Sequence, residues 1–292
     1  MTTSSWSTVI DHTSDAGFRA WGSEWQAKLS GAGLVQTADT GQINWGTVTR
    51  AAINSNAGYG VWRFADSSFY IKFFYGTGNV ANRPRIQAQV GTGSDGSGGL
   101  TGQLSTLTTI TRVADLSSTV TAYQSFLCIT ADFFGILWKA NSLNTANIGF
   151  GFFAIDKFCD STGAATTDGA VIYYISSSSG LAQFPSYEPL KISSPPMSYG
   201  VSTAFCLVPA LITTTAVGGD NQILLHMTPT TPLIRPVKNI FSIINSELAL
   251  STTMTATPVG ATPHTYIGLN SQVGRGNSAS VSHDVGFAML WE

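Results

Sequence analysis

The sequence predicts a mainly β protein, a jelly-roll-like β-sandwich that follows a short N-terminal helix. Charged residues make up 10% of the 292 residues, against about 25% in a typical soluble domain. Because 43% of the residues are hydrophobic and 11% are aromatic, this is not the composition of a disordered chain. Most apolar runs are short, rich in β-branched or aromatic residues and bounded by turn formers, which is typical of strands.

One N-terminal segment shows the period of a helix. It carries a stripe of large apolar residues at helical spacing: Phe18, Trp21, Trp25 and Leu29. Asp15 suits the N-cap, and Gly31 and Gly33 suit the end, so we expect a helix over about 15–31.

The apolar stripe of this helix has two interpretations. It can pack on the β domain that follows, or it can dock on a neighbouring subunit, because two tryptophans and a phenylalanine are a large apolar load for one face. Under the second interpretation, the subunit contacts are Arg19, Trp21 and Trp25.

The remaining sequence reads as strands and loops without a fixed repeat. We expect strands at 43–50, 59–64, 69–75, 85–90, 123–138, 148–155, 171–175, 201–212, 221–227, 238–245, 263–269 and 284–291, with loops at 91–102 and 176–200. The predicted organisation is an N-terminal helical segment (1–35) and one sandwich domain with long loops (36–292). A sub-boundary is possible near 176–200.

Bulk properties exclude several classes of protein. The net charge is −2 and no Lys/Arg stripe is present, so we expect no nucleic-acid partner. Residues Met1–Thr8 do not resemble a signal peptide, and no apolar run approaches the roughly 18 residues of a membrane span. Cys128, Cys159 and Cys206 are interpreted as reduced packing residues, with one disulfide as the alternative.

Asp39-Thr40-Gly41 is the tripeptide that aspartic proteases place at a catalytic carboxylate. That chemistry needs two carboxylates sharing a proton, and the tripeptide occurs once in this chain. We therefore expect a turn in which Asp and Thr side chains bond nearby backbone N–H groups and Gly41 takes a positive φ.

Residues 91–96 fit the pattern G-x-G-x-x-G. A nucleotide site would also need a helix opening at this point, and the glycines that follow cannot start a stable one. We expect a hairpin tip and no cofactor.

Scattered acids give weak signals for other chemistry. Asp156, Asp160 and Asp168 bracket a Ser/Thr/Gly loop that could hold Ca²⁺, but the spacing favours a solvated hairpin. The four histidines form no metal pattern, so no metal site is predicted. Asp132, Asp156 and Glu188 are candidate glycosidase acids that nothing singles out. We predict no catalytic residues and no enzyme.

Four stretches together resemble a family of tailed-bacteriophage virion proteins. They are TSDAGFRAWGSEWQAKLSGAGLVQTADTGQINWGTVTR (13–50), GYGVWRFAD (58–66), VGTGSDGSGG (90–99) and, more loosely, IGFGFFAIDKFCDSTGAATTDG (148–169). The resemblance covers residues 6–102 well and 126–175 loosely. Lys157-Phe158-Cys159 departs from it, standing at an expected turn where the family would have more charge.

The resemblance implies a structural component of the virion, in the tail tip or baseplate region. It would be made in the host cytoplasm and would assemble with copies of itself and with other virion proteins. A head decoration or cement protein is one alternative. A host-surface glycan-binding tail protein is another, in which Tyr187 and Tyr199 would stack on sugars.

Overall fold

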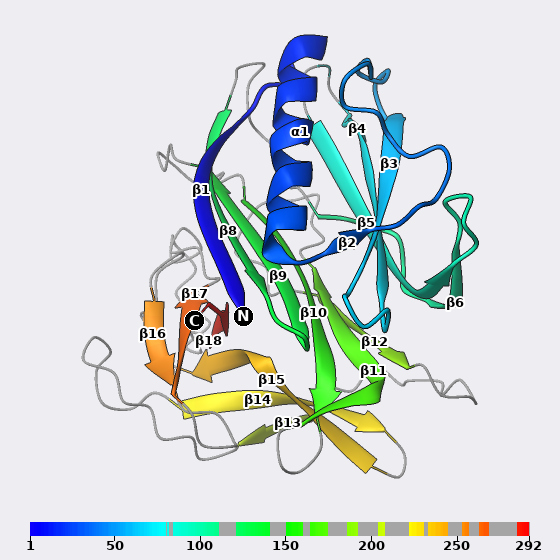
Figure 1. Ribbon diagram of the computed structural model, residues 1–292. Coiled ribbons are helices and arrows are strands. Elements are labelled where there is room, and N and C mark those ends of the chain that lie inside the picture. Colours follow the sequence, from blue (N-terminus) through cyan, green and yellow to red (C-terminus); the bar gives the residue numbers. More distant parts are fainter. Residues whose placement is uncertain are drawn as a thin grey trace.

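The computed structural model of this chain is mainly β, with three sheets and one helix near the N-terminus (Figure 1). It describes residues 1–79, 81, 84–110, 121–140, 150–159, 164–174, 186–191, 204–207, 222–230, 233–244, 253–256, 263–268 and 285–291. The predicted mainly β class with an N-terminal helix is therefore confirmed.

Sheet A is the central layer and has the order β1-β8-β9-β10-β11-β12. Its strands are β1 (Thr2–Ile10), β8 (Thr121–Ile129), β9 (Phe133–Ala140), β10 (Phe150–Cys159), β11 (Ala165–Tyr174) and β12 (Ser186–Lys191). All neighbouring strands are antiparallel. The apolar run 123–138 is thus two strands, with a turn at Thr130–Asp132 where the Asp132 N–H donates to Thr130 Oγ1 at 3.0 Å.

Sheets B and C are the outer layers. Sheet B, in the order β2-β3-β4-β5-β6, contains β2 (Val35–Gln36), β3 (Asn56–Arg63), β4 (Tyr70–Thr77), β5 (Pro84–Ser94) and β6 (Leu100–Leu104), with β7 (Thr108–Thr109) also paired to β5. Sheet C, in the order β13-β14-β15-β18-β17-β16, contains β13 (Ala204–Leu207), β14 (Gln222–Thr230), β15 (Leu233–Ile244), β16 (Thr253–Ala256), β17 (His264–Gly268) and β18 (Val285–Leu290).

Helix α1 (Asp15–Ala32) matches the predicted span within one residue. Its N-cap is Ser14, not Asp15: the Ser14 hydroxyl accepts the Gly17 N–H, while Asp15 occupies the first turn, where an acidic residue favours the helix dipole. The helix ends at Gly33 in the left-handed conformation. Its apolar stripe is buried in the same core as the facing residues of sheets A and B.

The central strands of sheet A, β9 and β10, are buried on both faces. Trp138, Phe134 and Phe153 belong to the core shared with sheet B and α1. The opposite face meets sheet C, where the Phe126 ring lies 5.5 Å from that of Trp291 and Asp156 bonds to β15. Strands covered on both faces do not alternate, which explains why 126–138 and 148–155 read as continuous apolar runs.

The segment 43–50 is not a strand, contrary to the sequence prediction. Asn44 starts a turn: its carbonyl accepts the Thr47 and Val48 N–H groups, and its side chain accepts the Gly46 N–H. Trp45 is nevertheless 6% exposed, because its ring inserts beside Trp21 and Tyr75. Apolar residues that anchor an irregular segment therefore imitated the pattern of a half-buried strand.

Strand β1 was not expected from the sequence. It pairs with β8 over its whole length, from Thr2↔Ile129 to Ile10↔Thr121, so residues 1–35 contribute a strand to sheet A as well as the helix. The described strands after residue 200 all belong to sheet C. Strand β12, which completes sheet A, lies within 176–200, so the prediction of a loop over that whole range is wrong.

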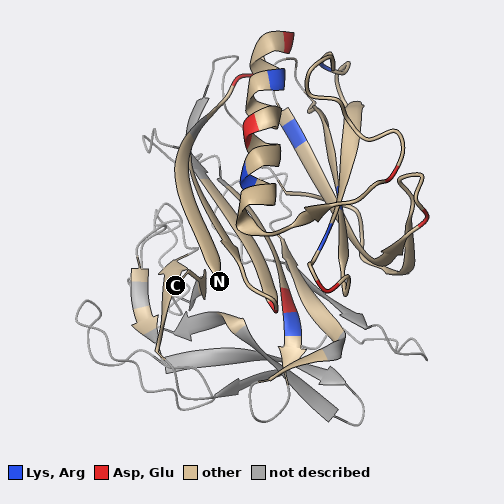
Figure 2. Cartoon of the chain, in the orientation of Figure 1, with Lys and Arg blue, Asp and Glu red and all other residues tan. Residues whose placement is uncertain are grey.

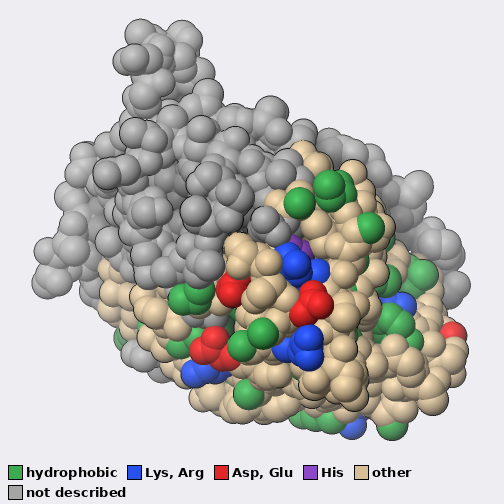
Figure 3. All heavy atoms as spheres, turned by 90° about the horizontal axis from the view of Figure 1, so that it is seen from above, with side chains coloured by type: hydrophobic (Ala, Val, Ile, Leu, Met, Phe, Trp, Pro, Cys, Tyr) green, Lys and Arg blue, Asp and Glu red, His purple; other side chains and the backbone are tan. Residues whose placement is uncertain are grey.

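Charged side chains are sparse over the described part of the chain (Figure 2). Seen from above, the few acidic and basic groups lie among uncharged side chains (Figure 3). Among the described helices, none is long and apolar enough to cross a membrane.

Candidate functional site

Two of the sequence motifs meet in one place, which we call the Asp39 clamp: Asp39 with the Ser94 hydroxyl and the Gly98 N–H, which both bond its carboxylate. Both donate to Oδ2, the Gly98 N–H at 2.9 Å. The Thr40 N–H also donates to the Gly96 carbonyl at 3.0 Å. The Asp-Thr-Gly turn and the Gly-rich hairpin tip are therefore bonded to each other.

Asp39 is 8% exposed. Burial alone would raise the pKa of its carboxyl, but hydrogen bonds from Ser94, Thr37 and the Gly98 N–H hold that pKa below its ordinary value. The clamp thus favours an ionised carboxylate. A protease dyad shares a proton between two carboxylates, whereas the groups of the hairpin that bond Asp39 Oδ2 are a hydroxyl and a backbone N–H.

Tyr59 and Lys72 close the clamp from sheet B. The Tyr59 hydroxyl lies 2.8 Å from the Thr40 carbonyl and 3.2 Å from that of Ser97. The Lys72 ammonium donates to the Gly98 carbonyl and lies 4.0 Å from the centre of the Tyr59 ring. Such a cation–π contact adds to the attachment of the hairpin.

The two motifs need their glycines for backbone reasons. Gly41 has φ +77°, as predicted for the turn. Gly98 has φ +90°, and a Cβ there would lie 2.1 Å from the Tyr59 hydroxyl. The G-x-G-x-x-G stretch leads into strand β6, so no helix N-terminus is presented to a phosphate. One correction follows: the backbone N–H group that bonds the Asp39 carboxylate is that of Gly98, 59 residues away, and not one in the turn itself.

Asp156 is fully buried on β10 and ties sheet A to sheet C. Its carboxylate accepts the Asn239 N–H at 2.9 Å, the Asn239 side-chain amide at 2.7 Å and the Ile240 N–H at 3.1 Å. These contacts give Asp156 a structural task in place of the calcium or glycosidase role considered from the sequence. Asp160 lies outside the described residues, and the side chains of Asp168 and Glu188 are not described. Asp132 lies in the β8–β9 turn.

Lys157, the next residue, ties sheet A to sheet B. Its ammonium lies 2.6 Å from Asp66 Oδ2 in the β3–β4 turn and 5.1 Å from the centre of the Phe64 ring. The lysine side chain is 5% exposed and that of Asp66 is 51% exposed. Residues 157–159 belong to strand β10, so the turn expected there was wrong.

The helix residues chosen as subunit contacts are mostly inside the chain. Trp21 is 3% exposed and Trp25 is 2% exposed. The Trp25 indole N–H donates to the Tyr75 hydroxyl at 3.0 Å, and its ring centre lies 5.3 Å from that of Trp138. The interpretation in which these tryptophans dock on a neighbouring subunit is therefore wrong. They join α1 to sheets A and B instead.

The other predicted contact residues are placed as follows. Arg19 is half-buried, and its Nε donates to the Asp15 carbonyl at 3.1 Å, so a role in subunit contact stays a prediction. Tyr187 lies on β12, opposite Tyr173 in the ladder, but its side chain is not described. Tyr199 lies outside the described residues.

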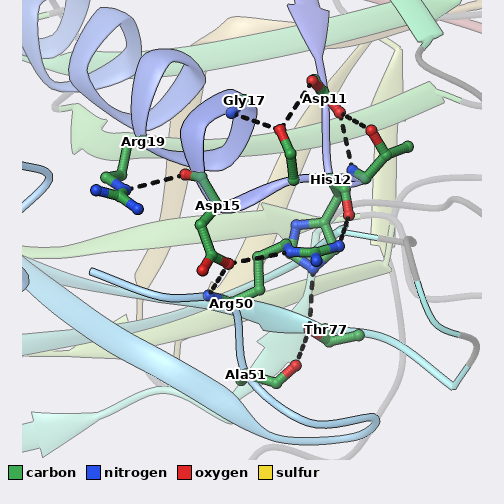
Figure 4. A network of polar contacts seen from close by, with 10 residues as sticks. Asp11, His12, Asp15, Gly17, Arg19, Arg50, Ala51 and Thr77 are labelled. Carbon is green, nitrogen blue, oxygen red and sulfur yellow. Dashed lines mark hydrogen bonds and ion pairs between the residues drawn. The ribbon is translucent and has the colours of Figure 1, made fainter. Parts of the chain in front are cut away.

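A polar network at the β1–α1 junction was missed (Figure 4). His12 is 2% exposed, and its Nε2 lies 2.9 Å from Thr77 Oγ1. Because that hydroxyl donates to the Ala51 carbonyl at 2.7 Å, it accepts from His12, which fixes the neutral Nε2–H tautomer. Burial, with the nearby Arg50 guanidinium, lowers the pKa of His12 to about 4, against the opposing charges of Asp11 and Asp15.

Arg50 and Asp15 complete this network. Arg50 donates its Nη1–H to the His12 carbonyl at 2.7 Å, and its backbone N–H and Nε–H to Asp15 Oδ1 at 3.0 and 3.2 Å. The sequence signal was the polar run Asp11-His12-Thr13-Ser14-Asp15 before a helix. It gave no indication of the distant partners, Arg50 and Thr77.

Two further predictions concern cysteines and metals. Cys128 and Cys159 are buried thiols, as predicted, whereas the side chain of Cys206 is not described. Among the described side chains, no group of three or more His, Cys, Asp or Glu residues could hold a metal ion.

Comparison of this chain with protein-family models, with curated proteins and with solved structures finds no match.

Proposed function

We propose that this chain is a non-enzymatic structural component of a tailed-bacteriophage virion, located in the tail tip or baseplate region. One observation carries the proposal. The stretches that resemble the virion family, around residues 37–45, 58–64 and 90–99, converge on the Asp39 clamp. The residues of these stretches fix the fold by bonding to one another. Residues with a structural task of this kind are what we expect a family of assembly components to have in common.

The use of the other ionic groups supports the same proposal. Asp156 and Lys157 join three layers, and Asp15 with Arg50 fixes the start of α1. Each group is engaged with the chain itself, whereas a catalytic acid, base or nucleophile must have an atom directed at a substrate. A rigid three-layer body with a weakly charged surface is suited to packing against copies of itself and other virion proteins.

A head decoration or cement protein is the alternative that composition fits equally well. The two positions differ in copy number, with hundreds of copies expected on a head and few to tens at a tail tip. The glycan-binding alternative has less support, because it relies on Tyr187 and Tyr199, whose side chains are not described.

The test is quantitative mass spectrometry of purified virions of the phage that encodes the chain, separated into heads and tails. Few to tens of copies in the tail fraction is the expected result. Hundreds of copies with the heads would replace the tail position by the decoration role. Absence from both fractions would overturn the virion proposal.

A further inference from the structure

Strand β1 is the longest edge strand in the described part of the molecule. In Figure 1 it forms the outer edge of sheet A, beside β8 and next to α1. Within the described residues, its only ladder is with β8. In an antiparallel pair every second residue turns its N–H and C=O away from the partner strand, so the free side of β1 presents a row of donors and acceptors.

The sequence of β1 lacks the usual protection of a sheet edge. In natural proteins, short length, bulges, prolines or charges keep an edge strand from pairing with another chain. The nine residues TTSSWSTVI contain no proline, no glycine and no charge, and their register with β8 has no shift. Trp6 and Ile10 point into the core, while Ser5, Ser7 and Val9 are exposed.

Within the described residues, the other edge strands are short or carry a proline and charges. The opposite edge of sheet A, β12, has six residues and contains Glu188, Pro189 and Lys191. Proline lacks an N–H, which interrupts any further ladder. The edges of sheet C, β13 and β16, have four residues each. In sheet B, β2 has two residues and β6 has five.

We propose that β1 is a self-association edge, which pairs antiparallel with β1 of a second copy about a two-fold axis and joins two A sheets into one. An uncharged strand meets no like-charge repulsion when it opposes itself, and facing serines and threonines can hydrogen-bond across the strands. A two-fold axis also closes the assembly at a dimer. This deepens the proposed assembly role and rests on it, since it names the surface through which copies meet.

The test is the oligomeric state of the full chain at micromolar concentration, by light scattering after size exclusion. Wild type is expected to be a dimer. Ser5→Lys with Ser7→Lys places like charges across the pairing and is expected to raise the dimer Kd by about tenfold or more. Ser23→Lys with Ser30→Lys, which adds the same charge at exposed positions of α1, is expected to leave the dimer intact.

Charge complementation keeps the test independent of folding. Mixing the Ser5→Lys/Ser7→Lys variant with Ser5→Glu/Ser7→Glu is expected to restore dimers containing one of each. A monomeric wild type, a dimer unaffected by the β1 lysines, or a mixture that fails to pair would each overturn the proposal. A chain that pairs through β1 but is absent from virions would overturn the virion assignment and leave the edge contact standing.

Discussion

Asp156 on β10 and Asn239 on β15 are joined by two hydrogen bonds, from the Asn239 backbone N–H at 2.9 Å and from its side-chain amide at 2.7 Å. Both residues are buried, 83 positions apart in the chain. The contact attaches sheet C to the middle of sheet A. Removing the carboxylate would leave three buried donors without an acceptor, and such orphaned groups are costly.

Asp156→Ala is expected to lower the free energy of unfolding by about 3–5 kcal/mol. Asn239→Ala removes one of the three donors and should cost less. Urea unfolding gives the stabilities, and hydrogen exchange should show lost protection at the Asn239 and Ile240 amides. A cost for Asp156→Ala no greater than that of Asn239→Ala would show that the carboxylate is not the tie between these sheets.

Replacing either partner of the Lys157–Asp66 pair should have unequal effects. Asp66→Asn leaves an almost fully buried ammonium without its carboxylate, and is expected to cost about 1 kcal/mol. Lys157→Met keeps the apolar stem and leaves a half-exposed Asp66 in water, so its cost should be smaller. The reverse order in denaturant midpoints would contradict this assignment.

Acid should destabilise the chain through His12. The folded-state pKa of about 4 lies below the unfolded value of 6.5, so between these pH values the unfolded chain binds a proton that the folded chain does not. The contribution of His12 to the free energy of unfolding is therefore fully present above about pH 6.5. It falls by about 3 kcal/mol as the pH drops to 4. His12→Gln should remove this slope in urea unfolding measured across the window. An unchanged slope would rule out His12 as its source.

Truncation of the helix tryptophans should unfold the chain. Losing a buried Trp costs about 3–5 kcal/mol, and a native domain has about 5–15 kcal/mol in all, so Trp21→Ala with Trp25→Ala should abolish cooperative unfolding followed by circular dichroism. Arg19→Ala, on the same helix, should stay within about 0.5 kcal/mol of wild type. A double variant that still unfolds cooperatively would contradict the assignment of these tryptophans to the core that joins α1 to the sheets.

Local patterns predicted the local structure well. The stripe from Phe18 to Leu29 gave α1, and alternation gave β3, β4 and β5 to within a few residues. Strand β1 carried a usable signal too, because Trp6 and Ile10 are four positions apart and therefore lie on the same face of a strand, among β-branched and hydroxyl residues. No charged residue or turn within the strand marked it.

The polar contacts that define the candidate site could not be predicted in the same way. Asp39 meets Gly98 across 59 residues, and His12 meets Thr77 across 65. Such partners depend on how the sheets stack, not on spacing along the chain. Each motif taken alone therefore suggested chemistry, in the case of Asp39 a protease and in the case of the glycines a nucleotide site, although the two motifs complete each other.

That the Asp39 carboxylate ties the Asp-Thr-Gly turn to the Gly-rich hairpin is tested most directly by a double-mutant cycle of unfolding free energies with Asp39→Ala and Ser94→Ala. A coupling energy of about 1–3 kcal/mol is predicted, because each single variant already breaks the same part-buried hydrogen bond. The pair Asp39→Ala and Ser23→Ala, with Ser23 exposed on α1, should be additive within about 0.5 kcal/mol. If the effects of Asp39→Ala and Ser94→Ala on the free energy of unfolding are also additive, the Asp39 clamp does not tie the two motifs together.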